Sequence, residues 1–163
     1  MLPYDECEPY VQHLLTEHRR LHTMLRLARA AIRHSAGPDR DATTSDIVRI
    51  LRQVREEIAH HFADEEAGGC IEEAVSRCPH ISHQANRVQA EHPDLLRKLD
   101  ALIADVLDSR HTVADRIAVQ REFDELCQLL HAHEAAENDI LRQGFGVNVN
   151  GDPSGGLPLP LDV

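Results

Sequence analysis

The chain has 163 residues, of which 42% are hydrophobic but only 3% aromatic, and it contains no Trp. This length and balance favour a single all-helical domain over two domains or over a β-sandwich or barrel. The formal net charge of −11 argues against a nucleic-acid surface, which needs clustered Lys and Arg, and disfavours binding to anionic membranes.

Two long helices are predicted in the first half of the chain, at about residues 9–34 and 46–67. The first would begin near Pro9, which suits a first helical turn, and a Gly-containing break follows each helix. Their inward faces, read at steps of three and four residues, are Val11, Leu14, His18, Leu21, Leu25, Ala28 and Ile32, then Ile47, Leu51, Val54, Ile58, His61 and Glu65.

Two further long helices are predicted at about 80–109 and 112–142, after a short helical connection at 70–78. Pro93 lies inside the first of them, where it removes a backbone hydrogen bond, so a kink or a restart of the helix is expected there. Their inward faces are Val88, His92, Leu95, Leu99, Leu102 and Val106, then Val119, Phe123, Leu126, Leu130, His133, Glu137 and Ile140.

The short connections predict that the long helices alternate in direction. We therefore expect an antiparallel up-down-up-down four-helix bundle over residues 1–143, and a flexible tail rich in Gly and Pro over 144–163. At 1.5 Å of rise per residue, the His residues on the four inward faces lie roughly 22–32 Å from the same end of the bundle. The sequence thus predicts that they meet in one layer.

Six polar residues interrupt the apolar faces, and all six carry side chains that bind metal ions: His18, His61, Glu65, His92, His133 and Glu137. Burying such a polar group without a partner costs roughly 2–7 kcal/mol, and more for a charge. A bound metal ion is the usual compensation, and a total of twelve His residues supports that interpretation.

The mixture of imidazoles and carboxylates suits iron or manganese, with zinc possible. Six ligands exceed the needs of one tetrahedral zinc ion. They fit two ions that each take two imidazoles and share both carboxylates, which leaves coordination positions for oxygen, peroxide or water.

Other polar residues near these faces have more ordinary explanations. His60, Asp64 and Glu66 lie just off the inward face, and we expect them to be solvated or to support a ligand. His22, one turn after His18, is a weaker ligand candidate. The remaining His residues are expected at the surface: His13, His34, His80, His83, His111 and His131.

The lack of a recognisable targeting signal and the spacing of the Cys residues predict a cytoplasmic protein. The start of the chain lacks the basic and apolar regions of a signal peptide, and no apolar run is long enough to span a bilayer. The Cys residues, at positions 7, 70, 78 and 127, form no CxxC pair, so free thiols are expected.

Four short motifs resemble the hemerythrin-like family, also called HHE cation-binding domains. The resemblance covers roughly residues 9–142 and implies a four-helix bundle with a non-haem di-iron centre. The motifs are Glu17-His18-Arg19-Arg20-Leu21, His61-Phe62-Ala63-Asp64-Glu65-Glu66, Glu91-His92 and His133-Glu134-Ala135-Ala136-Glu137. By this resemblance one iron is bound by His18 and His61 and the other by His92 and His133, with Glu65 and Glu137 bridging.

The chain departs from the oxygen-carrying members of that family at two points. Those members have a second His one turn before the ligand of the third helix, where this chain has Val88. They also end the fourth helix with His and Asp at i+5, whereas His133 and Glu137 are spaced at i+4. The missing imidazole opens a coordination position, so reaction with oxygen or peroxide, or metal sensing, is expected ahead of reversible oxygen carriage.

The leading hypothesis is a di-iron protein that binds or senses oxygen or a related small oxidant such as peroxide or NO. One alternative is a peroxide-decomposing enzyme at the same centre, with Glu66 or Glu17 moving protons. Another is an iron- or zinc-binding regulatory protein. A histidine phosphotransfer module is disfavoured, because it needs an exposed His near a Lys. The sequence leaves open whether the protein is an enzyme.

Overall fold

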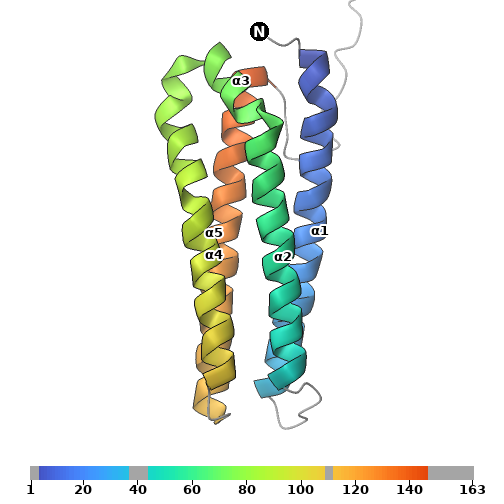
Figure 1. Cartoon of the computed structure of the whole chain (residues 1–163), viewed down its shortest axis with the longest axis vertical. Helices are drawn as coiled ribbons and strands as arrows, with labels where there is room; N and C mark the ends of the chain where they lie inside the picture. The colour runs from blue at the N-terminus through green and yellow to red at the C-terminus, as the bar shows by residue number, and fades with distance from the viewer. Residues whose placement is uncertain (1–3, 37–43, 109–111, 147–163) are drawn as a thin grey trace, which may run out of the picture.

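The structure, a computed structural model, is all-helical over the residues that it describes, 4–36, 44–108 and 112–146 (Figure 1). Four long helices are joined in the middle by a short helix and a 3-10 turn. The bounds are α1 Tyr4–Ala36, α2 Thr44–Gly68, α3 Cys70–Arg77, η1 Pro79–Ile81, α4 Ser82–Asp108 and α5 Val113–Phe145. The predictions of an all-α fold and of a short connecting helix are confirmed.

The four long helices lie side by side as rods (Figure 1). α1 packs against α2 and α5, and α4 packs against the same two helices. α3 packs mainly on α5 and lies at the end of the molecule where α1 begins and α5 ends. Each long helix therefore turns its inward face to an interior that all four share.

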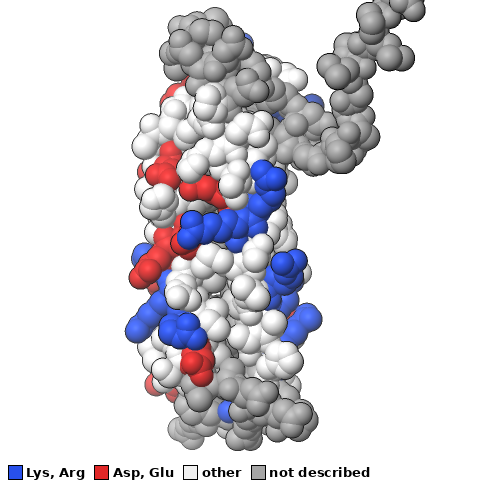
Figure 2. All heavy atoms as spheres, turned by 90° about the vertical axis from the view of Figure 1, so that its right-hand side faces the viewer, with Lys and Arg blue, Asp and Glu red and all other residues white. Residues whose placement is uncertain are grey.

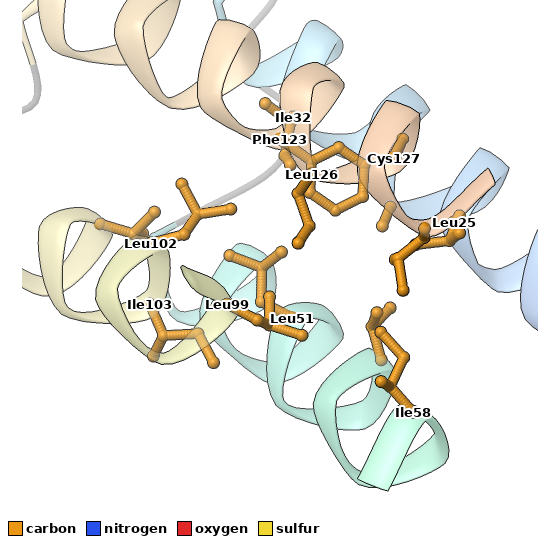
Figure 3. Close-up of a cluster of buried hydrophobic side chains, with 14 of the residues drawn as sticks. Leu25, Ile32, Leu51, Ile58, Leu99, Leu102, Ile103, Phe123, Leu126 and Cys127 are labelled. Atoms are coloured by element: carbon orange, nitrogen blue, oxygen red, sulfur yellow. The ribbon is translucent and has the colours of Figure 1, made fainter. Parts of the chain in front are cut away.

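The largest apolar cluster occupies the part of the bundle away from α3, and we call it the apolar half. Leu51, Leu99 and Phe123 are completely buried in it, and Figure 3 shows side chains from all four long helices meeting there. Two smaller clusters lie at the α3 end. The apolar half comprises buried residues within 21–32 of α1, 47–62 of α2, 95–106 of α4 and 119–130 of α5.

Two helix boundaries differ from the prediction. α1 begins at Tyr4, so Pro9 lies inside the helix and does not start it, because Pro is compatible with an early turn without marking the first residue. α5 continues to Phe145 and ends at Gly146, whose φ of 70° gives a left-handed cap. The predicted domain boundary at 143 therefore falls within α5, and the rest of the predicted tail lies outside the described residues.

A kink or a restart of the helix was expected at Pro93, and the restart is wrong, because α4 runs through Pro93 without interruption. A Pro inside a helix costs about 3 kcal/mol, because it removes a hydrogen bond and crowds the preceding turn. His92 and Leu95 on either side of it are buried, and α4 packs on both α2 and α5. This packing holds the helical geometry that the local sequence disfavours.

Two further expectations concern thiols and membranes. Cys78 and Cys127 are free thiols, as predicted, and Cys127 is buried like Cys70. The side chain of Cys7 lies outside the described part of the chain. Among residues 4–36, 44–108 and 112–146, no helix has both the length and the low polarity needed to cross a bilayer.

Candidate metal centre

The structure brings all six predicted ligand residues together in one buried layer between the apolar half and the α3 end. α1 contributes one His, α4 contributes one His, and α2 and α5 each contribute a His and a Glu one turn apart. None is more than 5% exposed to solvent. They are His18, His61, Glu65, His92, His133 and Glu137.

The same-helix pairs in this layer are short. The Nε2 atom of His61 lies 2.9 Å from Oε1 of Glu65, and Nε2 of His133 lies 2.9 Å from Oε1 of Glu137. A spacing of i,i+4 places both side chains on one face of a helix, so the sequence pattern directly produces this geometry.

Contacts between helices tie these pairs together. The Nε2 atom of His92 on α4 lies 3.4 Å from Oε2 of Glu65. The Nε2 atom of His18 on α1 lies 3.7 Å from Oε1 of Glu65 and 3.6 Å from Oε2 of Glu137. Each carboxylate therefore lies among imidazoles from different helices.

The donors divide into two candidate ligand groups, and the ligand atoms within each group lie within 4.8 Å of one another. One group holds the imidazoles of His18 and His61, and the other holds those of His92 and His133. Both groups contain Glu65 and Glu137. A carboxylate has two oxygens, so each Glu can serve one ion on either side.

Several of these buried atoms lack a hydrogen-bond partner within the described part of the chain. They are both side-chain oxygens of Glu65 and Glu137 and the Nε2 atoms of His92 and His133. An unsatisfied buried donor or acceptor costs about 1–3 kcal/mol, and more if it is charged. The imidazole nitrogens and carboxylate oxygens thus lie close together without forming hydrogen bonds of good geometry. A cation bound between them would give these atoms a partner. The donor set fits the metal ions that the sequence predicts.

Three further carboxylates accept hydrogen bonds from three of the four imidazoles, on the side away from the layer. Nδ1 of His61 donates a hydrogen bond to Glu17 at 3.1 Å. Nδ1 of His92 donates to Glu66 at 2.9 Å, and Nδ1 of His133 donates to Glu91 at 3.0 Å. A carboxylate accepts, so Nδ1 carries a proton, and Nε2 is the ring nitrogen that faces the layer and can bind a cation once it has lost its own proton.

Sequence reasoning missed this supporting role of Glu91 and named Glu17 only as a proton-transfer group, whereas support of a ligand was one of the roles expected for Glu66. The available signal was their position directly beside a predicted ligand in the chain. Neighbouring residues on a helix point about 100° apart. Glu17 and Glu91 therefore face the ligand of the next helix and not the His that follows each of them.

The metal-free layer is electrostatically balanced by protons on its imidazoles. Burial lowers the pKa of His18, but Glu137 and Glu65 outweigh it and raise that pKa to about 10. His92 behaves in the same way, and Glu137, Glu65 and Glu66 raise its pKa to about 10. Although burial favours their neutral forms, the neighbouring imidazoles lower the pKa of Glu65 and of Glu137. The layer is therefore a place where positive charge is stabilised.

Apolar groups border the layer. The ring of Phe62 stacks on that of His92, with centroids 4.0 Å apart and planes 4° apart. Val88 is completely buried. It stands where the oxygen-carrying proteins named in the sequence analysis have a His. These neighbours lower the local dielectric, which strengthens interactions between the carboxylates and a bound cation.

The other His residues lie outside the layer. His22 is exposed, and its Nε2 atom lies 2.5 Å from Oε2 of Glu134, a buried residue that the sequence did not single out. Together with His131 they line a shallow surface hollow of about 430 Å³. The residues predicted at the surface are exposed, except that His111 lies outside the described residues: His13, His34, His80, His83 and His131.

Comparison with known proteins adds an independent observation. The family described as hemerythrin HHE cation binding domain matches residues 10–141, a span that contains the whole buried layer. No curated protein and no solved structure matches the chain. The family description indicates cation binding, in agreement with the buried groups of His and Glu. The chain belongs to the hemerythrin HHE cation-binding domain family.

Proposed function

We propose that this protein holds a non-haem di-iron centre in an antiparallel up-down-up-down four-helix bundle and uses it in the cytoplasm to bind or sense oxygen or a related small oxidant. The observation that carries the proposal is that both candidate ligand groups contain the same two carboxylates, Glu65 and Glu137. Two cations that share two carboxylates account for all six buried donors at once.

The donor chemistry suits iron, as it also suits manganese and zinc. His18 and His61 would hold one ion, and His92 and His133 the other. Imidazoles mixed with carboxylates suit iron, manganese or zinc, and neither group includes a thiolate that would select a softer ion. When bound, iron supplies redox chemistry toward oxygen, peroxide or NO. The competing proposal, a regulatory site for iron or zinc, uses the same residues.

The protein residues determine how complete the coordination is. Each group offers two imidazoles and one oxygen from each shared carboxylate, fewer donors than a six-coordinate ion accepts. Val88 supplies no further imidazole next to His92. The side chains thus leave positions for a small exogenous ligand while Phe62 and the apolar half keep bulk water away.

Metal analysis tests the proposal. The purified chain would be reconstituted with Fe²⁺ without oxygen, and iron per chain would be measured together with the optical spectrum before and after adding oxygen. We expect two ions per chain in the wild type and in E125Q, which alters an exposed carboxylate on α5. E65A is expected to lose iron. Fewer than one iron per chain in the wild type would sink the proposal.

Peroxide decomposition is a second candidate, and the position of Glu66 favours it. This carboxylate accepts a hydrogen bond from His92 while 58% of its side chain is exposed. A group that touches both a ligand imidazole and solvent is placed to exchange protons between them. In an oxygen-evolution assay with added peroxide, E66Q should evolve oxygen more slowly per bound iron, with the iron content of each sample measured alongside. Absence of oxygen evolution from the iron-loaded wild type would leave binding or sensing alone.

A further inference from the structure

Four metal-binding side chains gather on the outer surface of α1 and α2, apart from the buried layer. His13 and Glu17 are one turn apart on α1, and His60 and Asp64 are one turn apart on α2. We call these four residues the outer quartet. Two His-carboxylate pairs at i,i+4 therefore face each other across the interface between the two helices.

The distances within the outer quartet link the two helices. Nε2 of His13 lies 3.2 Å from Oε1 of Glu17 and 3.9 Å from Oδ2 of Asp64. Nδ1 of His60 lies 3.1 Å from the same Asp64 oxygen and 4.0 Å from the same Glu17 oxygen. Each imidazole thus approaches both carboxylates, whereas an ordinary i,i+4 surface pair involves one partner on its own helix.

The separations within each helix, 3.2 and 3.1 Å, are those found between ligands of a single metal ion, and the two between helices, 3.9 and 4.0 Å, are wider. Tetrahedral zinc with bonds of about 2.0–2.1 Å has neighbouring ligand atoms roughly 3.3 Å apart. The ligand atoms of His13, Glu17 and Asp64 all lie within 4.8 Å of one another. The donor types, two imidazoles and two carboxylate oxygens, suit a divalent transition-metal ion.

The outer quartet differs from the buried layer in exposure, yet touches it. The side chains of His13 and His60 are 56% and 70% exposed, so an ion there could exchange with solvent. Oε1 of Glu17 faces the quartet, and its Oε2 accepts the hydrogen bond from the buried ligand His61. Figure 2 shows acidic and basic side chains next to each other on the α1 side of the molecule.

We propose that His13, Glu17, His60 and Asp64 form a second, solvent-accessible site for one divalent transition-metal ion, joined to the buried centre through Glu17. Neither the family match nor the proposed function assigns this site. The site does not depend on the buried centre being occupied, because the ligand atoms of His13, Glu17 and Asp64 already lie within 4.8 Å of one another in this structure and His60 approaches both carboxylates.

Zinc is the probe for the test. The iron-loaded full chain would be dialysed against graded Zn²⁺, with iron and zinc per chain both measured, so that displacement of iron is seen directly. H13A/H60A removes both imidazoles of the outer quartet. H34A/H83A is the matched control, because His34 and His83 are exposed elsewhere. Circular dichroism checks that each variant is folded.

We expect one zinc ion beyond the iron in the wild type and in H34A/H83A. In H13A/H60A its affinity should fall at least about 100-fold, since losing a group that merely orients a ligand already costs 10- to 100-fold. Equal zinc binding by all three chains, or no additional zinc in the wild type, would overturn the proposal. If the chain takes no iron, the same titration on the metal-free chain separates the two ideas: a zinc ion that requires His13 and His60 supports the outer site although the di-iron proposal has failed.

Discussion

The apolar half and the buried polar layer are built on the same four helices, yet they contribute to the protein in opposite ways. Residues such as Leu99 and Phe123 are completely buried among other apolar groups, so their burial stabilises the fold. Glu65 and Glu137 are equally inaccessible but have oxygens without hydrogen-bond partners. The comparison indicates that the apolar half supplies stability. This stability lets the buried polar layer hold charged groups that can bind cations.

The largest expected effect comes from opening a cavity in the apolar half. F123A should lower the free energy of unfolding by about 3–5 kcal/mol, because a fully buried aromatic ring is lost. The loss should be the same with and without metal, as measured by denaturant unfolding in the presence of iron or of a chelator. A loss that depends on metal would mean that the two regions do not act separately.

The next largest effect on stability is expected when metal is removed from the polar layer. A ligand that binds the folded chain at 100 to 1,000 times its dissociation constant stabilises it by about 2.7–4.1 kcal/mol. We therefore expect chelation to lower the thermal midpoint of the wild type and to leave that of E65A unchanged. An identical midpoint before and after chelation of the wild type would show that the layer gains nothing from cations.

The pH dependence of the metal-free chain should follow the shifted pKa values. The raised pKa of His18 and of His92 stabilises the fold fully below the unfolded value of 6.5, and this contribution is lost as pH rises toward about 10. The lowered pKa of Glu65 and of Glu137 adds stability that is present above 4.5 and is lost as pH falls. Chelated protein should thus be most stable between about pH 4.5 and 6.5.

Denaturant midpoints across pH check this expectation. Metal binding should show the opposite trend and tighten as pH rises from 6.5, because the imidazoles must release protons to bind a cation. If the chelated chain were instead more stable at pH 9 than at pH 6, the balance of protons described for the layer would be wrong.

The smallest expected effect concerns the outside support of a ligand. E91Q keeps a side chain of similar size next to His133 but replaces the carboxylate that accepts its Nδ1 proton. Metal affinity should fall 10- to 100-fold, or about 1.4–2.7 kcal/mol, with little change in the stability of the metal-free chain. Chelator competition measures the affinity, and E125Q should match the wild type. An unchanged affinity for E91Q would remove Glu91 from the support of the site.

The sequence predicted most of the fold and the gathering of the six ligands, because both follow from helical periodicity. A buried His or Glu at the same three- or four-residue step as Leu99 and Phe123 must enter the same interior. The boundaries were less predictable. The start of α1 at Tyr4 and the continuity of α4 through Pro93 depend on packing between helices, which a local reading of the sequence does not contain.

The partners of some polar groups outside the inward faces were also beyond sequence reasoning. Glu17 and Glu91 support imidazoles on neighbouring helices, so their partners depend on how the helices are rotated against each other. The outer quartet needs the same information, since its two pairs meet only when α1 and α2 pack side by side. Each pair alone looks like an ordinary surface pair of residues.

Anomalous X-ray scattering from a crystal of the iron-loaded chain, recorded at the iron edge, tests the central claim most directly. The account predicts two peaks in the buried layer, each beside one pair of imidazoles and both adjacent to Glu65 and Glu137. A map without iron in this layer, with His18, His61, His92 and His133 packed directly against the two carboxylates, would contradict it.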